Sequence, residues 1–231
     1  MARLPRLVVP GHAHLVVQRV LPGCAPFADA SGRLLCLAAL REAVAATGVR
    51  LHAFALRDDE LQLVLTPAAP AALAGAMQAL GRRHVAAFNR LHGRSGTLWS
   101  GRFRSAALEP GDVVLNALLL LDGAGTDATV SSAAHHLGLR REPWLHDPPE
   151  YWQLGNTPFE RERAWAGRLA LGAPDAACAA LRRSAAGGWP CGSAAFVAAL
   201  ATRTDRPLTP RPRGRPPGSH RALATTGAAN G

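Results

Sequence analysis

The sequence predicts an α+β fold: a ferredoxin-like βαββαβ antiparallel sheet with helices on one face, followed by a helical extension and a disordered basic tail. Three observations lead to this prediction. Four short β-rich runs surround two long stretches with helical periodicity, an Ala-rich region follows, and apolar residues almost vanish after Thr204.

The first three elements follow from residue periodicity. Leu15 and Val17 alternate with their neighbours in a first strand over residues 12–20. Ser31 is the expected N-cap of a helix with leucines at 34, 37 and 40, ending near Gly48. Residues 49–56 and 61–66 then form a hairpin around the polar stretch 57–60.

The remaining elements of the sheet unit follow the same logic. Residues 71–91 have apolar positions at helical spacing and a basic side with Arg83 and Arg90, which predicts an amphipathic helix. Residues 99–107 are expected to form the fourth strand, with Arg102 and Arg104 on one face, before an apolar helix at 112–121.

Three regions are expected along the chain. Residues 1–122 form the first domain, which contains the sheet and the apolar helix. Residues 123–203 form a helical C-terminal extension with helices at 157–171 and 193–202. Residues 204–231 form a disordered Arg/Pro/Gly tail.

The composition favours a globular protein outside the membrane. Apolar residues make up 48% of the chain, yet no apolar run is long enough to cross a bilayer, and the start of the chain lacks the apolar segment of a secretory signal. We therefore expect a cytoplasmic, nucleoid-associated protein with no membrane partner.

The charge suits a polyanionic partner. The formal net charge is +10, and all 26 basic residues other than histidine are arginines, which can grip phosphate through two parallel hydrogen bonds. Codon bias in a GC-rich genome is an alternative explanation for the same composition.

Cysteines and histidines give no metal motif by spacing. The four cysteines are widely separated. His12 and His14 share a strand face, where a packing role is favoured over a ligand role. His135 and His136 are adjacent, so we expect them to point to different sides of a helix and not to form a metal site.

Several segments in a shared order resemble the REP-associated tyrosine transposases, relatives of the single-tyrosine HUH transposases. The resemblance covers roughly residues 3–217 and implies that residues 1–122 form a transposase-like domain for DNA binding on a catalytic fold. It is carried by residues 10–14 with Gln18 and Arg19, 48–54, 77–83, 96–104, 154–161, 192–193 and 210–216.

The resemblance implies a mechanism. In that family two histidines, one residue apart on a strand, bind a divalent metal that polarises a DNA phosphate, and a tyrosine on a following helix attacks the phosphorus. The product is a 5′-phosphotyrosine, which can be reversed to join strands.

The residues at the corresponding positions indicate that this chemistry is lost. Glu60 and Gln62 stand where the two histidines are expected, and a leucine, Leu119 in the favoured alignment, stands at the tyrosine position. We therefore expect no intact catalytic residue and no cofactor. Glu60 and Gln62 remain candidate ligands for Mg²⁺ or Mn²⁺ if any activity is left. The only tyrosine, Tyr151, is expected to be a packing residue.

Arginines that coincide with the resembling motifs are the expected DNA contacts. Phosphate contacts of this kind give salt-sensitive affinity with little base discrimination, and a solvated Arg-rich face is the alternative. An AT-hook-like core in the tail is a second candidate element. The expected DNA-binding residues are Arg82, Arg83, Arg90, Arg94, Trp99, Arg102, Arg104, Arg213 and Arg215.

Three hypotheses remain open from the sequence. The first is a transposase-like protein that binds hairpin or single-stranded DNA and is defective in strand cleavage. The second is an active metal-dependent transposase in which Glu60 and Gln62 replace the histidine pair. The third is a nonspecific Arg-rich protein or decaying gene product. The sequence leaves a homodimer open.

Overall fold

The computed structural model describes residues 5–127 and 129–210. Its centre is a four-stranded antiparallel sheet in the order β2-β3-β1-β4, which confirms the predicted ferredoxin-like unit. The strands are β1 (His14–Arg19), β2 (Val49–Arg57), β3 (Glu60–Pro67) and β4 (Arg104–Ala107). No helix in the described ranges is long and apolar enough to cross a membrane.

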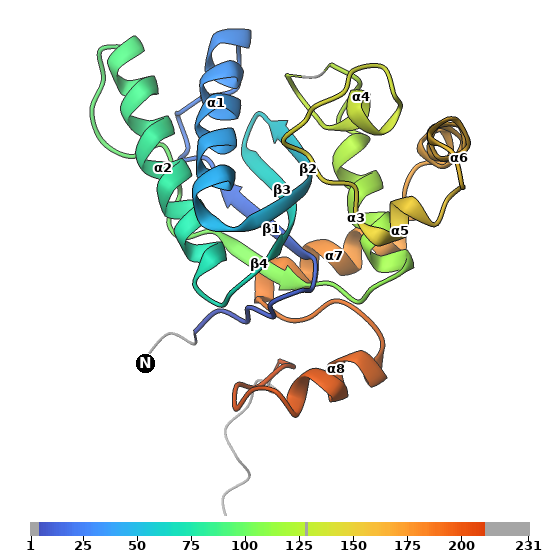
Figure 1. Cartoon of the computed structure of the whole chain (residues 1–231). Coiled ribbons are helices and arrows are strands. Elements are labelled where there is room, and N and C mark those ends of the chain that lie inside the picture. The colour runs from blue at the N-terminus through green and yellow to red at the C-terminus, as the bar shows by residue number, and fades with distance from the viewer. Residues whose placement is uncertain (1–4, 128, 211–231) are drawn as a thin grey trace, which may run out of the picture.

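Two long helices cover one face of the sheet (Figure 1). They are α1 (Ala30–Thr47) and α2 (Ala72–Leu91). Alternation along each strand sorts the side chains between the two faces, because successive residues point to opposite sides. Leu61, Leu63 and Leu65 of β3 pack under α1 and α2, whereas Val64 packs on the other side.

The second face is covered by α3 (Asp112–Asp122) and by the extension, whose packing against the sheet was not part of the sequence prediction. Trp165, Cys178 and Leu181 of the extension share one buried cluster with Leu15 and Val64 of the sheet. The extension helices are α4 (Ala133–His136), α5 (Pro149–Trp152), α6 (Pro158–Leu171), α7 (Asp175–Gly187) and α8 (Ala194–Ala201).

Backbone segments of the extension also cover both outer edges of the sheet. Along β2, the amide of Leu56 donates to the Val130 carbonyl at 2.8 Å, and the amide of His146 donates to the Leu51 carbonyl at 2.8 Å. Along β4, the amide of Cys191 donates to the Ala107 carbonyl at 2.8 Å. Edge strands that are paired in this way offer no open ladder for aggregation.

Two expected element starts were wrong. Asp29, not Ser31, caps α1, because Asp29 is extended and its side chain accepts a 2.7 Å hydrogen bond from the Gly32 amide. The fourth strand begins at Arg104, not Trp99, because the chain turns at Gly101, which has a φ of 75° that favours glycine. Trp99 makes only an isolated bridge to Val20.

The expected helices of the extension are otherwise present. Thr157 caps α6 in a capping box with Glu160, and Ser193 caps α8. No residue range was predicted for α7. The division into regions 1–122, 123–203 and 204–231 stays a prediction, and the tail from residue 211 onward, with Arg213 and Arg215, lies outside the described residues.

Candidate nucleic-acid interface

A groove runs along β4 on the sheet face opposite α1 and α2. It consists of two adjoining hollows, of about 490 Å³ and about 360 Å³, that share Arg102 and Arg104; we call it the β4 groove. The first hollow brings together side chains from five elements, β1, β3, β4, α3 and α7, and from the turns before β3 and β4. Its charged and amide side chains are Arg19, Asp59, Glu60, Gln62, Arg102, Arg104 and Arg182.

Strand alternation explains how the sheet contributes to this groove. Leu15, Val17 and Arg19 of β1 point to the same face, as do Glu60 and Gln62 of β3. In the antiparallel register Arg19 is opposite Glu60 and Val17 is opposite Gln62, so these residues are neighbours on that face.

Three of the arginines present unengaged guanidinium groups. Within residues 5–127 and 129–210, Arg102, Arg104 and Arg182 make no ion pair or side-chain hydrogen bond, and all three are exposed. Arg182 enters the groove from α7, so the extension completes the basic surface. Four arginines against two acidic side chains give the hollow a positive balance that suits phosphate.

The second hollow extends this surface towards the amino-terminal segment. It contains Trp189 and Arg206, whose guanidinium carbon lies 5.4 Å from the Trp189 ring centre. Arg206 also donates to the Pro5 carbonyl at 2.7 Å. An aromatic ring beside a basic channel is a platform on which an unpaired base can stack.

Two of the three expected catalytic positions, those of Glu60 and Gln62, lie in the first hollow. The Gln62 amide donates to the Glu60 carboxylate, which also lies 3.9 Å from Arg19. Leu120, not the expected Leu119, lines the hollow, because each helical residue turns the side chain by about 100°. Neither leucine offers a nucleophile.

Most features of Glu60 and Gln62 oppose binding of the divalent metal of the resembled family. The pair supplies no imidazole, the carboxylate is engaged, and the surrounding arginines disfavour a cation. Gln62 Oε1 is buried without a hydrogen-bond partner, a feature that favours a cation.

The expected arginine cluster is divided between two sides of the molecule. Arg82, Arg83, Arg90 and Arg94 lie on or just after α2, whereas Arg102 and Arg104 lie across the sheet. Arg83 pairs with Glu42 of α1 at 2.8 Å, and Arg94 contacts the Cys24 sulfur at 3.3 Å. The sequence could not show this division because it depends on which sheet face each element covers.

Trp99 is a packing residue. It lies half-buried beside the α1–α2 core, with its ring 5.5 Å from His84 and 6.2 Å from Phe27. The turn at Gly101 separates Trp99 from Arg102 and Arg104, and the expected DNA contact of Trp99 stays a prediction.

Sequence reasoning missed Arg19 and Arg182. Arg19 could have been found, since it continues the alternation of Leu15 and Val17 along β1. Arg182 had no usable signal, because its place depends on the long-range packing of α7 beside β4.

A solved structure shares this architecture. A REP-associated tyrosine transposase, described as bound to a REP hairpin, matches with a TM-score of 0.50 and 9% identity, over 65% of this chain and 93% of that chain. The fold is that of a REP-associated tyrosine transposase. A candidate transposase from Deinococcus radiodurans R1 matches at 22% identity with a TM-score of 0.36, over 48% of this chain and 88% of that chain. No family model and no curated protein matches.

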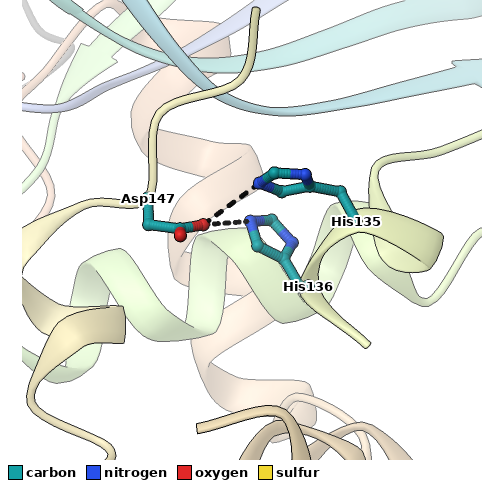
Figure 2. A group of neighbouring side chains, drawn as sticks. All are labelled: His135, His136 and Asp147. Atoms are coloured by element: carbon teal, nitrogen blue, oxygen red, sulfur yellow. Dashed lines mark hydrogen bonds and ion pairs between the residues drawn. The ribbon is translucent and has the colours of Figure 1, made fainter. Parts of the chain in front are cut away.

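Outside the groove, the predictions for Tyr151 and His14 agree with the structure, whereas part of the prediction for His135 and His136 does not. Tyr151 is buried and donates to the His136 carbonyl at 2.6 Å, in agreement with a packing role. His14 is also a scaffold residue, bonded through both ring nitrogens to backbone atoms. The predicted orientation of His135 and His136 was wrong: both imidazoles turn toward the Asp147 carboxylate (Figure 2).

Proposed function

We propose that the chain binds hairpin or single-stranded DNA in the β4 groove without cutting it. The observation that carries the proposal is the set of unpaired arginines Arg102, Arg104 and Arg182 on the groove surface. Their guanidinium groups match phosphate geometry, and Trp189 beside them offers a stacking surface for a base. The shared fold of a transposase that holds a REP hairpin supports this ligand class.

The absence of cleavage in this proposal rests on the chemistry of the first hollow of the β4 groove. A phosphotyrosine mechanism needs a phenol beside the scissile phosphate, and Leu120 lines the hollow where α3 approaches the sheet. The only phenol in the chain, that of Tyr151, is buried, and burial raises its pKa above the ordinary value, which opposes formation of a phenolate.

In this proposal the groove residues have separate tasks. Arg102, Arg104 and Arg182 neutralise phosphates, while Glu60 and Gln62 bond to each other and present a polar floor. Expected targets are therefore segments with exposed bases and a flexible backbone, which can follow the groove between β4 and α7.

A second candidate function is metal-dependent strand transfer with Mg²⁺ or Mn²⁺ at Glu60 and Gln62. The unpartnered Gln62 Oε1 favours this function. The four arginines around it and the engaged Glu60 carboxylate oppose it.

One assay separates these functions. Labelled hairpin oligonucleotide is mixed with the purified protein in Mn²⁺ at about 0.15 M salt, beside a scrambled strand of equal length. We expect a retained complex with the hairpin, weaker retention of the scrambled strand and no nicked product. Nicking that disappears in Glu60→Ala would instead establish the enzyme, and equal retention of both strands would indicate a nonspecific Arg-rich protein.

A further inference from the structure

A second polar centre lies in the extension, outside the β4 groove. α4 carries His135 and His136, and Asp147 lies in the segment just before α5 (Figure 2). Their donor atoms all lie within 4.8 Å of one another. His135 Nε2 is 3.2 Å from Asp147 Oδ1, and His136 Nε2 is 4.0 Å from the same oxygen.

The second histidine is held as a ligand would be. His136 Nδ1 is 2.6 Å from Asp122 Oδ2, so it donates a hydrogen bond to that carboxylate. In the neutral ring its Nε2 carries a lone pair, and among the described residues this atom is buried without a hydrogen-bond partner. A carboxylate behind the imidazole that fixes ring and tautomer is the usual outer support of a metal-bound histidine.

The ring of the first histidine is also held in place by a hydrogen bond to Nδ1, but here Nδ1 accepts. His135 Nδ1 accepts the backbone N–H of Glu142 at 3.0 Å, so its lone pair is already used. Nε2 therefore faces Asp147 and carries the proton in the metal-free state. A ligand imidazole is neutral, so binding of a metal ion at Nε2 requires this proton to move to Nδ1, which then gives up the hydrogen bond from Glu142.

Charge balance favours a dication at the centre. Asp122 is fully buried and Asp147 is 11% exposed, and the ion pairs they make within the described ranges are with these two imidazoles. Because metal-bound imidazoles are neutral, the two carboxylates would leave about two negative charges in a nearly dry site, an arrangement that costs energy unless it is compensated. One divalent ion compensates both.

We propose that His135 Nε2, His136 Nε2 and Asp147 Oδ1 bind one Zn²⁺ ion. Nitrogen ligands favour zinc over magnesium or calcium, and tetrahedral zinc places neighbouring ligand atoms about 3.3 Å apart. The 3.2 Å pair already fits, and the 4.0 Å pair needs to close by less than about 1 Å. A water molecule takes the fourth position.

Three protein ligands with one water are more typical of catalytic zinc, but the burial of this centre points to a structural role. The three ligand side chains are nearly excluded from solvent, so substrate has little access. Zinc joins α4 to the segment before α5. Asp122, which also accepts from Trp165 Nε1 at 2.9 Å, links the centre to α3 and α6. This inference is independent of the proposed DNA binding.

The test is zinc binding by the full chain. Protein stripped with a chelator is titrated with Zn²⁺ against a chromophoric competitor, together with His135→Gln, Asp147→Asn and the control His92→Gln, an exposed histidine at the end of α2. We expect about one equivalent in the wild type and the control, and at least tenfold weaker binding in both ligand variants. Unchanged zinc binding in folded Asp147→Asn would overturn the proposal.

A second measurement keeps the proposal testable if a variant does not fold. X-ray absorption of zinc-loaded wild-type protein should show a four-coordinate nitrogen and oxygen shell with imidazole scattering. Sulfur in the shell would place the zinc at cysteines and overturn the proposal, as would a wild-type chain that binds no zinc.

Discussion

Asp122 concentrates more interactions than its type suggests. Its fully buried carboxylate accepts hydrogen bonds from His136 Nδ1, Ser132 Oγ and Trp165 Nε1 at 2.6, 2.6 and 2.9 Å. Burial alone would lower the pKa of His136, but the charge and hydrogen bond of Asp122 raise it above the ordinary value. One side chain at the end of α3 thereby fixes α4 and α6.

Replacing Asp122 by alanine should be severely destabilising. Three buried donors would lose their acceptor, and we expect a loss of about 3–5 kcal/mol in the free energy of unfolding, measured by urea denaturation. Asp58→Asn is the matched control, because Asp58 is exposed in the β2–β3 turn and should change stability by less than about 0.5 kcal/mol. Equal effects of the two changes would contradict this account of Asp122.

His84 should make stability sensitive to acid. It is fully buried among Phe27, Phe88 and Trp99 with neither ring nitrogen bonded, and burial lowers its pKa from 6.5 to about 4. The unfolded chain binds this proton more readily between these values. The contribution of neutral His84 is therefore complete above pH 6.5 and is lost as the pH falls towards 4.

His84→Phe isolates this effect. The stability of the variant relative to wild type should rise by about 2–3 kcal/mol between pH 7.5 and pH 4.5, because only the wild type loses the His84 contribution. Urea unfolding at both pH values measures the difference. A constant difference would show that His84 is not held neutral by burial.

Among the elements, helix ends and strand alternation were readable from the sequence, whereas element contacts were not. Thr157 to Glu160 has the spacing of a capping box, and the structure contains that box. The start of β4 was misjudged because the β-rich residues at 99–103 concealed the turn at Gly101. Leu120 was missed by one residue, since apolar residues run around most of α3.

Thr157→Ala should loosen the start of α6. The Thr157 side chain accepts a hydrogen bond from the Glu160 amide, and the Glu160 carboxylate accepts one from the Thr157 amide at 3.0 Å. We expect a loss of about 1 kcal/mol in thermal or urea unfolding, against no measurable change for the exposed loop variant Thr126→Ala. A neutral Thr157→Ala would mean that packing of Trp165 alone fixes the helix.

For the whole molecule, the buried cluster shared by sheet and extension predicts one cooperative unit. Tryptophan fluorescence reports mainly on the extension, which contains Trp144, Trp152, Trp165 and Trp189. Far-ultraviolet circular dichroism reports on the complete chain. We expect both signals to follow the same urea transition. Two separated transitions would show that regions 1–122 and 123–203 unfold independently.

The position of the candidate interface also depends on the whole molecule. Its basic composition was evident from the sequence, and so were Arg102 and Arg104 as members. The choice between the α2 arginines and the groove arginines was not, because it depends on sheet topology and on α7 delivering Arg182 from the extension.

The central claim is tested most directly by comparing these two arginine sets on hairpin DNA. Dissociation constants are measured across a salt series for Arg102→Gln/Arg104→Gln/Arg182→Gln and for the matched control Arg82→Gln/Arg90→Gln, whose arginines are exposed on α2. The account predicts that the groove variant binds at least about tenfold more weakly and loses roughly two units of salt slope, while the control changes little. Wild-type affinity in the groove variant, with loss in the α2 variant, would contradict it.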